Sequence, residues 1–148
     1  MYRHILIPTD GSELAEHGVA HGLALAKSLG AKVSLIFVVE PFSEMTGRFR
    51  EAVATYAELR KEQATSALDR AANAAKEAGV SCEPIQVENG QPHQAIIAAA
   101  ENKGCDLIVM SSHGRSGLSM LLIGSVTNKV LAQAKNSRTD LSVNVRIC

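Results

Sequence analysis

Short apolar runs alternate along this chain with longer segments in which apolar residues recur every three or four positions. The runs have the length of buried strands, and nearly continuous apolar runs are typical of parallel strands covered on both faces. Pro84 lies inside the third run and predicts an edge position for it, because proline cannot donate a hydrogen bond to a neighbouring strand. Strands are expected at 5–7, 33–39, 80–87, 106–110 and 141–147.

The segments between these runs predict helices. The first follows a turn in which Asp10 or Ser12 can accept hydrogen bonds from free helix N–H groups, and Gly30 ends it. A third helix opens with Gly90-Gln91-Pro92, buries Ile96, Ile97 and Ala100, and ends at Gly104, while a fourth covers 125–134.

Residues 49–78 are rich in Ala, Glu, Lys and Arg, and they predict one long helix that Gly79 caps. The segment before it, 42–48, has no clear period and is expected to be a loop. The expected buried stripe of the long helix consists of Val53, Tyr56, Leu59, Ala64, Leu68, Ala71 and Ala75.

Strand and helix alternate throughout, which predicts an α/β fold. We expect a single domain over residues 1–148: a Rossmann-like, open, five-stranded parallel sheet with helices on both faces. No repeat or low-complexity linker divides the 148 residues.

Composition narrows the function classes. Fifteen basic residues balance fifteen acidic ones and only 3% of residues are aromatic, so nucleic-acid binding is not expected. The three cysteines form no C-x-x-C pair, which argues against structural zinc and a disulfide framework. Because neither a leader nor a long apolar run is visible, we expect a cytoplasmic protein.

Two loops with unusual chemistry follow strands. One is Pro8-Thr9-Asp10-Gly11-Ser12, and the other runs over 111–125. In open α/β sheets, ligands bind beyond the carboxyl ends of the strands, where the strand order reverses. The two loops would face each other there if the first and fourth strands were neighbours.

The second loop combines glycines with donors. Glycines let backbone N–H groups approach an anion closely. Ser125 is expected at a helix N-terminus, where free N–H groups and the helix dipole favour phosphate, and Arg115 adds positive charge. The alternative is a plain capped turn that enters a helix. The loop is neither a Walker A sequence nor G-x-G-x-x-G, so a P-loop enzyme is not expected.

From Met1 to about Lys135 the chain resembles the universal stress protein family, and within it the nucleotide-binding branch. The resemblance lies in the opening from Ile5 to Ser12, in Gly90-Gln91-Pro92, and in the stretch from Asp106 to Gly117. That branch carries G-x-x-G, nine residues, then G-[S/T]. Here Gly114, nine residues, and Gly124-Ser125 match this spacing.

The resemblance implies roles by position. Asp10 would lie near the ribose and phosphates, through a metal ion such as Mg²⁺ or through water, and Val38 would offer backbone hydrogen bonds to adenine. Gly114, Gly124 and Ser125 would hold phosphates. The ligand would be ATP, AMP or another adenine nucleotide, and the protein a homodimer with a role in stress survival. The full set of implied site residues is Pro8, Thr9, Asp10, Val38, Met110, Ser111, His113, Gly114, Arg115, Gly117, Gly124 and Ser125.

This chain departs from the family pattern at two places. Ser111 replaces the first glycine of the pattern, and its Cβ restricts positive φ. After Ala134-Lys135 the family usually continues with a proline and a short Val-rich edge strand that often builds the dimer contact. This chain has residues 136–140 and then Leu141-Ser142-Val143-Asn144-Val145 instead.

Other candidate residues have simpler explanations. Glu13, His17 and His21 fall four apart on one helix face, as metal ligands can, but no further ligands converge in the sequence, so we expect a partly exposed helix face with two neutral histidines. His113 could contact phosphate or act as a general base, yet it has no visible nucleophile and orienting acid beside it.

The sequence leaves three functions open. We expect a regulatory protein that binds adenine nucleotide rather than an enzyme. A slow ATP hydrolase or nucleotidyl transferase could use the same pocket, with Asp10 holding Mg²⁺. An interaction module that has lost nucleotide binding is the third, and Ser111 is the feature that favours it.

Overall fold

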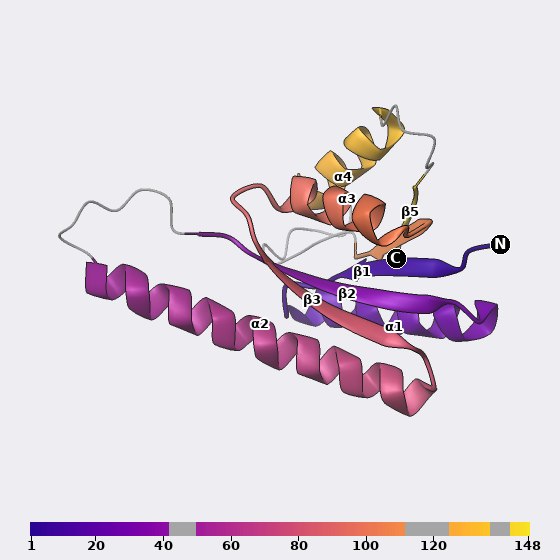
Figure 1. The fold of residues 1–148 in the computed structure, drawn as a ribbon, viewed down its shortest axis with the longest axis horizontal. Coiled ribbons are helices and arrows are strands. Elements are labelled where there is room, and N and C mark those ends of the chain that lie inside the picture. The colour runs from indigo at the N-terminus through magenta and orange to yellow at the C-terminus, as the bar shows by residue number, and fades with distance from the viewer. Residues whose placement is uncertain (42–49, 112–124, 137–142) are drawn as a thin grey trace.

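The computed structural model describes residues 1–41, 50–111, 125–136 and 143–148, in which strands and helices alternate (Figure 1). The strands are β1 (His4–Pro8), β2 (Lys32–Val39), β3 (Cys82–Glu88), β4 (Leu107–Met110) and β5 (Asn144–Ile147). The helices are α1 (Glu13–Leu29), α2 (Arg50–Ala78), α3 (Pro92–Lys103) and α4 (Ser125–Asn136).

The strands form one parallel sheet in the order β3-β2-β1-β4-β5, so the predicted fold class is confirmed. β1 lies at the centre and pairs with β2 on one side and with β4 on the other, where Ile5 lies opposite Leu107. The strand order therefore reverses between β1 and β4, which confirms the adjacency that the two loops required. A crevice at such a point is where open α/β sheets bind ligands.

Alternate residues of the strands enter two cores, one on each face of the sheet. Ile5 and Ile7 pack with α1 and α2, whereas Leu6 packs with α3 and α4. Because both faces are covered, the central strands carry apolar residues at nearly every position. Helices thus lie on both sides of the sheet, and the long α2 reaches beyond it (Figure 1).

Local signals end the elements where the sequence predicted. The Ser12 hydroxyl accepts a hydrogen bond from Ala15 N at 3.2 Å and caps α1. Gly30, Gly79 and Gly104 follow α1, α2 and α3 with φ between 67° and 74°, a left-handed region that costs glycine little. β3 is an edge strand, as Pro84 predicted.

The predicted buried stripe of α2 is wrong at its amino end. Tyr56 is 36% exposed and Leu59 is 51% exposed, whereas Arg60 is only 6% exposed. The buried positions of α2 are Arg60, Ala64, Ala67, Leu68, Ala71 and Ala75. Their spacing continues one helical stripe back to Arg60, so an arginine holds the buried place that was predicted for Tyr56 and Leu59.

The atypical tail completes the protein's own sheet. Residues 144–147 pair in parallel with β4, and Cys148 N donates to Met110 O at 3.2 Å. Residues 141 and 142 of the predicted strand lie outside the described residues, as does the predicted loop over 42–48.

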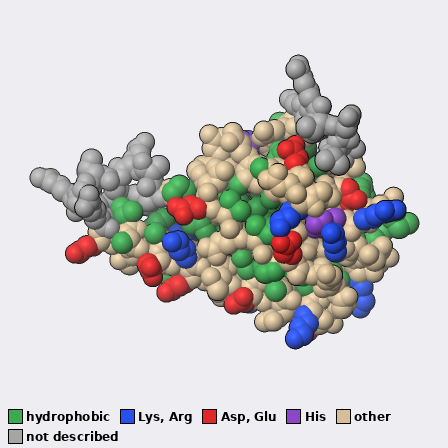
Figure 2. Space-filling model, in the orientation of Figure 1, with side chains coloured by type: hydrophobic (Ala, Val, Ile, Leu, Met, Phe, Trp, Pro, Cys, Tyr) green, Lys and Arg blue, Asp and Glu red, His purple; other side chains and the backbone are tan. Residues whose placement is uncertain are grey.

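The surface carries charges of both signs. On the face shown in Figure 2, acidic and basic side chains both occur, as a chain with balanced charge predicts. In the part of the chain that the structure describes, no helix has both the length and the apolar composition to cross a membrane.

Gly22 of α1 allows that helix to lie close to the sheet. A Cβ at this position would lie 2.5 Å from Cδ1 and 3.0 Å from Cγ1 of Ile7, whose side chain is fully buried. We therefore expect Gly22→Ala to lower the free energy of unfolding by about 1 kcal/mol, because overpacking outweighs the gain in helix propensity. Urea denaturation measures this change.

Ile7→Val supplies the matched control for that substitution. Alone it should cost about 1 kcal/mol. Combined with Gly22→Ala it removes the clashing Cδ1 atom, so the double variant should be more stable than the sum of the two costs implies. If the changes in the free energy of unfolding of the two single variants simply add in the double variant, Gly22 and Ile7 do not compete for this space.

His4 makes the stability depend on pH. Its Nε2 lies 2.8 Å from Ser34 Oγ in a buried pair, and burial, assisted by the charge of Lys32, lowers the pKa of His4 below its ordinary 6.5. The unfolded chain therefore binds the proton more readily than the folded chain does. This contribution to stability is complete above pH 6.5 and is lost as the pH falls through the lowered pKa.

We expect the free energy of unfolding to fall between about pH 7.5 and about pH 5, and to fall less in His4→Gln. Urea denaturation of both proteins across this range measures the difference. Parallel pH profiles for the two proteins would contradict the assignment to His4.

Candidate functional site

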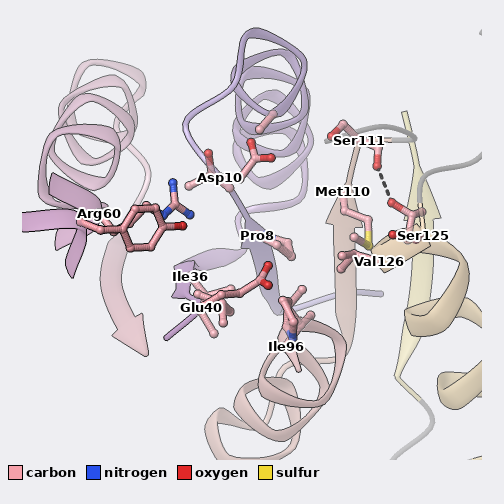
Figure 3. Close-up of a pocket in the computed structure, with 16 residues that line it drawn as sticks. Pro8, Asp10, Ile36, Glu40, Arg60, Ile96, Met110, Ser111, Ser125 and Val126 are labelled. Carbon is pink, nitrogen blue, oxygen red and sulfur yellow. Dashed lines mark hydrogen bonds between the residues drawn. The ribbon is translucent and has the colours of Figure 1, made fainter. Parts of the chain in front are cut away.

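A cavity of about 410 Å³ opens at the carboxyl ends of the strands (Figure 3). Residues from all three of the strands β1, β2 and β4, and from the helices on both faces, contribute to it. Its lining consists of Pro8, Thr9, Asp10, Ala15, Ile36, Val38, Glu40, Tyr56, Arg60, Pro92, Ile96, Met110, Ser111, Ser125, Val126 and Thr127.

Every predicted site residue that the structure describes lines this cavity. These seven are Pro8, Thr9, Asp10, Val38, Met110, Ser111 and Ser125. The other five predicted residues, His113, Gly114, Arg115, Gly117 and Gly124, lie outside the described residues. Residues far apart in the sequence thus meet at the point where the strand order reverses.

The loop after β1 is held by its own side chains. The Thr9 hydroxyl accepts a hydrogen bond from Gly11 N at 3.2 Å, and Asp10 Oδ1 accepts one from Ser12 N at 2.9 Å. Gly11 adopts a φ of 78°, which makes the tight turn into α1 without strain. The loop fixes the half-buried Asp10 carboxylate at the cavity wall.

The backbone of β2 presents polar groups beside the end of β1. The last paired residues are Pro8 and Ile36, and Thr9 N donates to Ile36 O at 2.9 Å. Val39 O, by contrast, accepts from Asn89 N on the β3 side. Because backbone groups alternate sides along a strand, the N–H and C=O of Val38 point the same way as those of Ile36, beyond the end of β1.

Ser111 is fixed from two sides where the chain leaves β4. The Thr127 hydroxyl donates to Ser111 O at 3.0 Å (dashed line in Figure 3), and Thr127 is 3% exposed. On the other side, a Cβ on Gly18 of α1 would lie 3.2 Å from Ser111 N. No described residue other than glycine has a positive φ, so serine at position 111 brings no backbone strain.

The amino end of α4 faces the cavity through its first residues. Ser125, Val126 and Thr127 all line the cavity, and the first N–H groups of a helix have no partners within it. Together with the helix dipole, such groups attract anions.

Four polar residues of the cavity lining were not predicted from the sequence. Glu40 follows the end of β2, Thr127 lies in α4, and Tyr56 and Arg60 come from α2. Helical spacing relative to Ala64 and Ala71 could have found Arg60, but a charged residue is not usually assigned to a buried stripe. For Glu40, Tyr56 and Thr127 the sequence offers no local signal.

Among the described residues, no cluster of side chains is placed to hold a metal ion, and two of the three cysteines are poor nucleophiles. Glu13, His17 and His21 are exposed along α1, and no group of three or more His, Cys, Asp or Glu is placed there to hold a metal ion. Burial raises the pKa of the Cys82 and Cys105 thiols to about 11, so both are protonated and weakly nucleophilic at neutral pH.

The matching family model and the similar known proteins name the same family. The sequence profile of the Universal stress protein family matches residues 1–137. Universal stress protein MJ0531 of Methanocaldococcus jannaschii is 37% identical over 136 residues, which cover 90% of this chain and 78% of that protein.

Solved structures agree with the sequence match. The universal stress protein UspA from Lactobacillus plantarum has a TM-score of 0.82 at 20% identity, covering 99% of this chain and 97% of that one, and so shares the fold. A universal stress protein solved in complex with cAMP has a TM-score of 0.70 at 25% identity, covering 99% of this chain and 97% of that one. The chain therefore belongs to the universal stress protein family.

Proposed function

We propose that this protein binds an adenine nucleotide, ATP in the first instance, in the cavity between β1 and β4, and that it acts as a stress-response regulator. The observation that carries the proposal is the pairing of two features across one cavity. The backbone of Val38 offers a donor and an acceptor beside the end of β1, and the amino end of α4 offers anion-attracting N–H groups.

The Val38 side suits the base. Adenine presents an amino donor and a ring-nitrogen acceptor side by side, which one C=O and one N–H group can satisfy together. Ile36 and Ile96 add apolar surface to the same cavity, and a flat base can be buried against them. Guanine carries an acceptor where adenine carries the amino donor, so it fits this pair of backbone groups poorly.

The α4 side suits the phosphates. Ser125 adds a hydroxyl to the N–H groups of the first turn, and Ser111 lies across from it at the end of β4. The G-x9-G-S spacing from Gly114 to Gly124 and Ser125 supports a phosphate-binding role for the loop between them. The relative solved with cAMP shows that a similar fold in this family holds an adenine nucleotide.

Asp10 would connect the two ends of the ligand. One of its carboxylate oxygens accepts from Ser12 N, which leaves the second oxygen for a ribose hydroxyl, a water or Mg²⁺. Mg²⁺ prefers oxygen ligands and usually combines one or two carboxylates with phosphate oxygens. The residues present thus fit a nucleotide with its metal ion, which would neutralise phosphate charge.

We propose regulation rather than catalysis as the role of the site. A ligand that binds one conformation better than another shifts the population towards it, and this needs no catalytic base. Hydrolysis needs a group that orients water at the terminal phosphate. Glu40, a carboxylate in the described lining, follows β2 on the side of the proposed base site. It does not lie beside α4, where the phosphates would be, so it is not placed to orient that water.

Calorimetric titration of the nucleotide-stripped protein with ATP and Mg²⁺ tests the proposal, with phosphate release followed on the same sample. We expect micromolar binding without steady release, and binding of GTP at least about tenfold weaker because its base carries the wrong donor pattern. Steady phosphate release would favour the slow hydrolase, and absence of any binding would favour an interaction module without nucleotide.

We propose that two copies of this chain form a homodimer in the cytoplasm through the outer edge of β5. β5 ends the sheet, and Asn144 N donates inward to Asp106 O. By alternation, the N–H of Val145 points outward, where a second copy can pair with it.

Sedimentation velocity should therefore give the mass of a dimer. Val145→Pro removes one outward N–H while the inward hydrogen bonds of β5 remain, so it should shift the mass towards the monomer. Thermal unfolding of the variant checks that the fold persists. A variant that stays dimeric would place the interface on another surface.

A further inference from the structure

Arg60 is a buried cation in the wall of the cavity. It comes from α2, is 6% exposed, and lines the cavity together with residues of β1 and β2. Its guanidinium carbon lies 5.5 Å from the centroid of the Phe37 ring. Charged side chains are seldom buried to this degree unless they are paired.

The described residues satisfy this guanidinium only in part. Nη1 donates to Gln63 Oε1 at 2.8 Å, but the buried Nε has no hydrogen-bond partner. The ion pairs among the described residues join Arg70 to Glu16 and Lys103 to Glu83, and neither involves Arg60. A guanidinium carries five N–H donors, so Arg60 retains donors for acceptors from elsewhere.

The position of Arg60 decides which half of a nucleotide it can meet. Phe37, on which it stacks, belongs to β2, whereas Ser111 follows β4, and β1 lies between these strands. Figure 3 shows Arg60 on one side of Asp10, with Ser111 and Ser125 on the other. The amino end of α4 is therefore remote from the guanidinium, and the Val38 backbone lies on the same strand as Phe37.

We infer that Arg60 is a ligand-binding residue that donates hydrogen bonds to acceptor atoms of the nucleoside half, the base or the ribose, of the nucleotide bound in this cavity. The inference rests on the proposed function. The ligand would supply acceptors to a guanidinium that the described protein groups leave partly unsatisfied, and burial strengthens such charge-assisted bonds.

Burying Arg60 also lowers the stability of the protein when no ligand is bound. Placing an arginine where the stripe of α2 calls for an apolar residue gives up hydrophobic contact and leaves Nε without a partner. Structural sites avoid this combination, while binding sites often sacrifice stability for function. A purely structural arginine on Phe37 would instead stabilise the ligand-free protein and leave ligand affinity unchanged.

The test compares Arg60→Met with Arg70→Met in the full-length protein. Methionine keeps an unbranched apolar side chain against Phe37 but removes the donors. Arg70 lies on the same helix, its side chain is 54% exposed, and it pairs with Glu16 on the surface, so it matches the chemistry of the change outside the cavity. Titrations with adenosine and with ATP and Mg²⁺ are run on wild type and both variants.

We expect Arg60→Met to weaken the binding of adenosine and the binding of ATP by the same factor, about tenfold or more. The reason is that the lost hydrogen bonds would lie on the nucleoside, which both ligands share. Arg70→Met should bind both like wild type. The melting temperature of the ligand-free Arg60→Met protein should stay at or above that of the wild type.

The remaining outcomes overturn the inference in distinguishable ways. Weaker ATP binding with unchanged adenosine binding would assign Arg60 to the phosphates, and unchanged binding of both would make it structural. If wild type binds neither ligand, the proposed function itself fails. Should Arg60→Met not fold, Arg60→Lys keeps the charge without the planar fork, and wild-type adenosine affinity in that variant would contradict directed hydrogen bonding.

Discussion

The site depends on where the central strand stops. β1 pairs with β2 only as far as Pro8 and Ile36, while β2 continues to Val39. Beyond Ile36, the side of β2 that faces β1 therefore has no strand to pair with. The N–H and C=O of Val38 become available there, beside the turn that carries Asp10. Since β4 pairs with the other side of β1, its exit at Ser111 meets the same crevice. One short strand thus brings together the turn that carries Asp10, near the start of the chain, and Ser111, in its last third.

Close packing of α1 keeps these parts in register. Gly22 lets the helix approach Ile7 of β1, and Gly18 lets it approach Ser111 as the chain leaves β4. Larger side chains at these positions would lift the helix from the sheet, and with it the Ser12 cap and the Asp10 turn at its amino end. The Thr127 hydroxyl adds a constraint from the opposite face by tying α4 to Ser111 O. The polar groups of the cavity are therefore held by packing on both faces of the sheet, which reduces the ordering that a ligand must impose.

The charged side chains that line the cavity differ in the partners that the protein gives them. The Asp10 carboxylate has a backbone donor in Ser12 N, whereas the Arg60 guanidinium has one side-chain acceptor and an aromatic face. Glu40 adds a second carboxylate to the lining, so the described wall combines two acidic side chains with one basic side chain. A polyanionic ligand gains little from this wall by net charge alone. Its attraction must come from directed N–H groups and the dipole of α4, which act at short range and select by geometry.

Much of the fold could be predicted because its signals are local: Ser12 caps α1, Gly30, Gly79 and Gly104 end helices, and Pro84 marks an edge strand. Seven predicted site residues meet in the cavity for a related reason, since loops after parallel strands share one edge of a sheet. The family could be recognised from its motifs and their spacing, which need no coordinates, and the family model over residues 1–137 confirms it. Tertiary structure alone decided that Tyr56 and Leu59 are exposed, that the Thr127 hydroxyl bonds Ser111 O, and that the tail pairs with β4. These contacts join residues distant in sequence, and local propensity carries no information about which surface a side chain will meet when the elements pack.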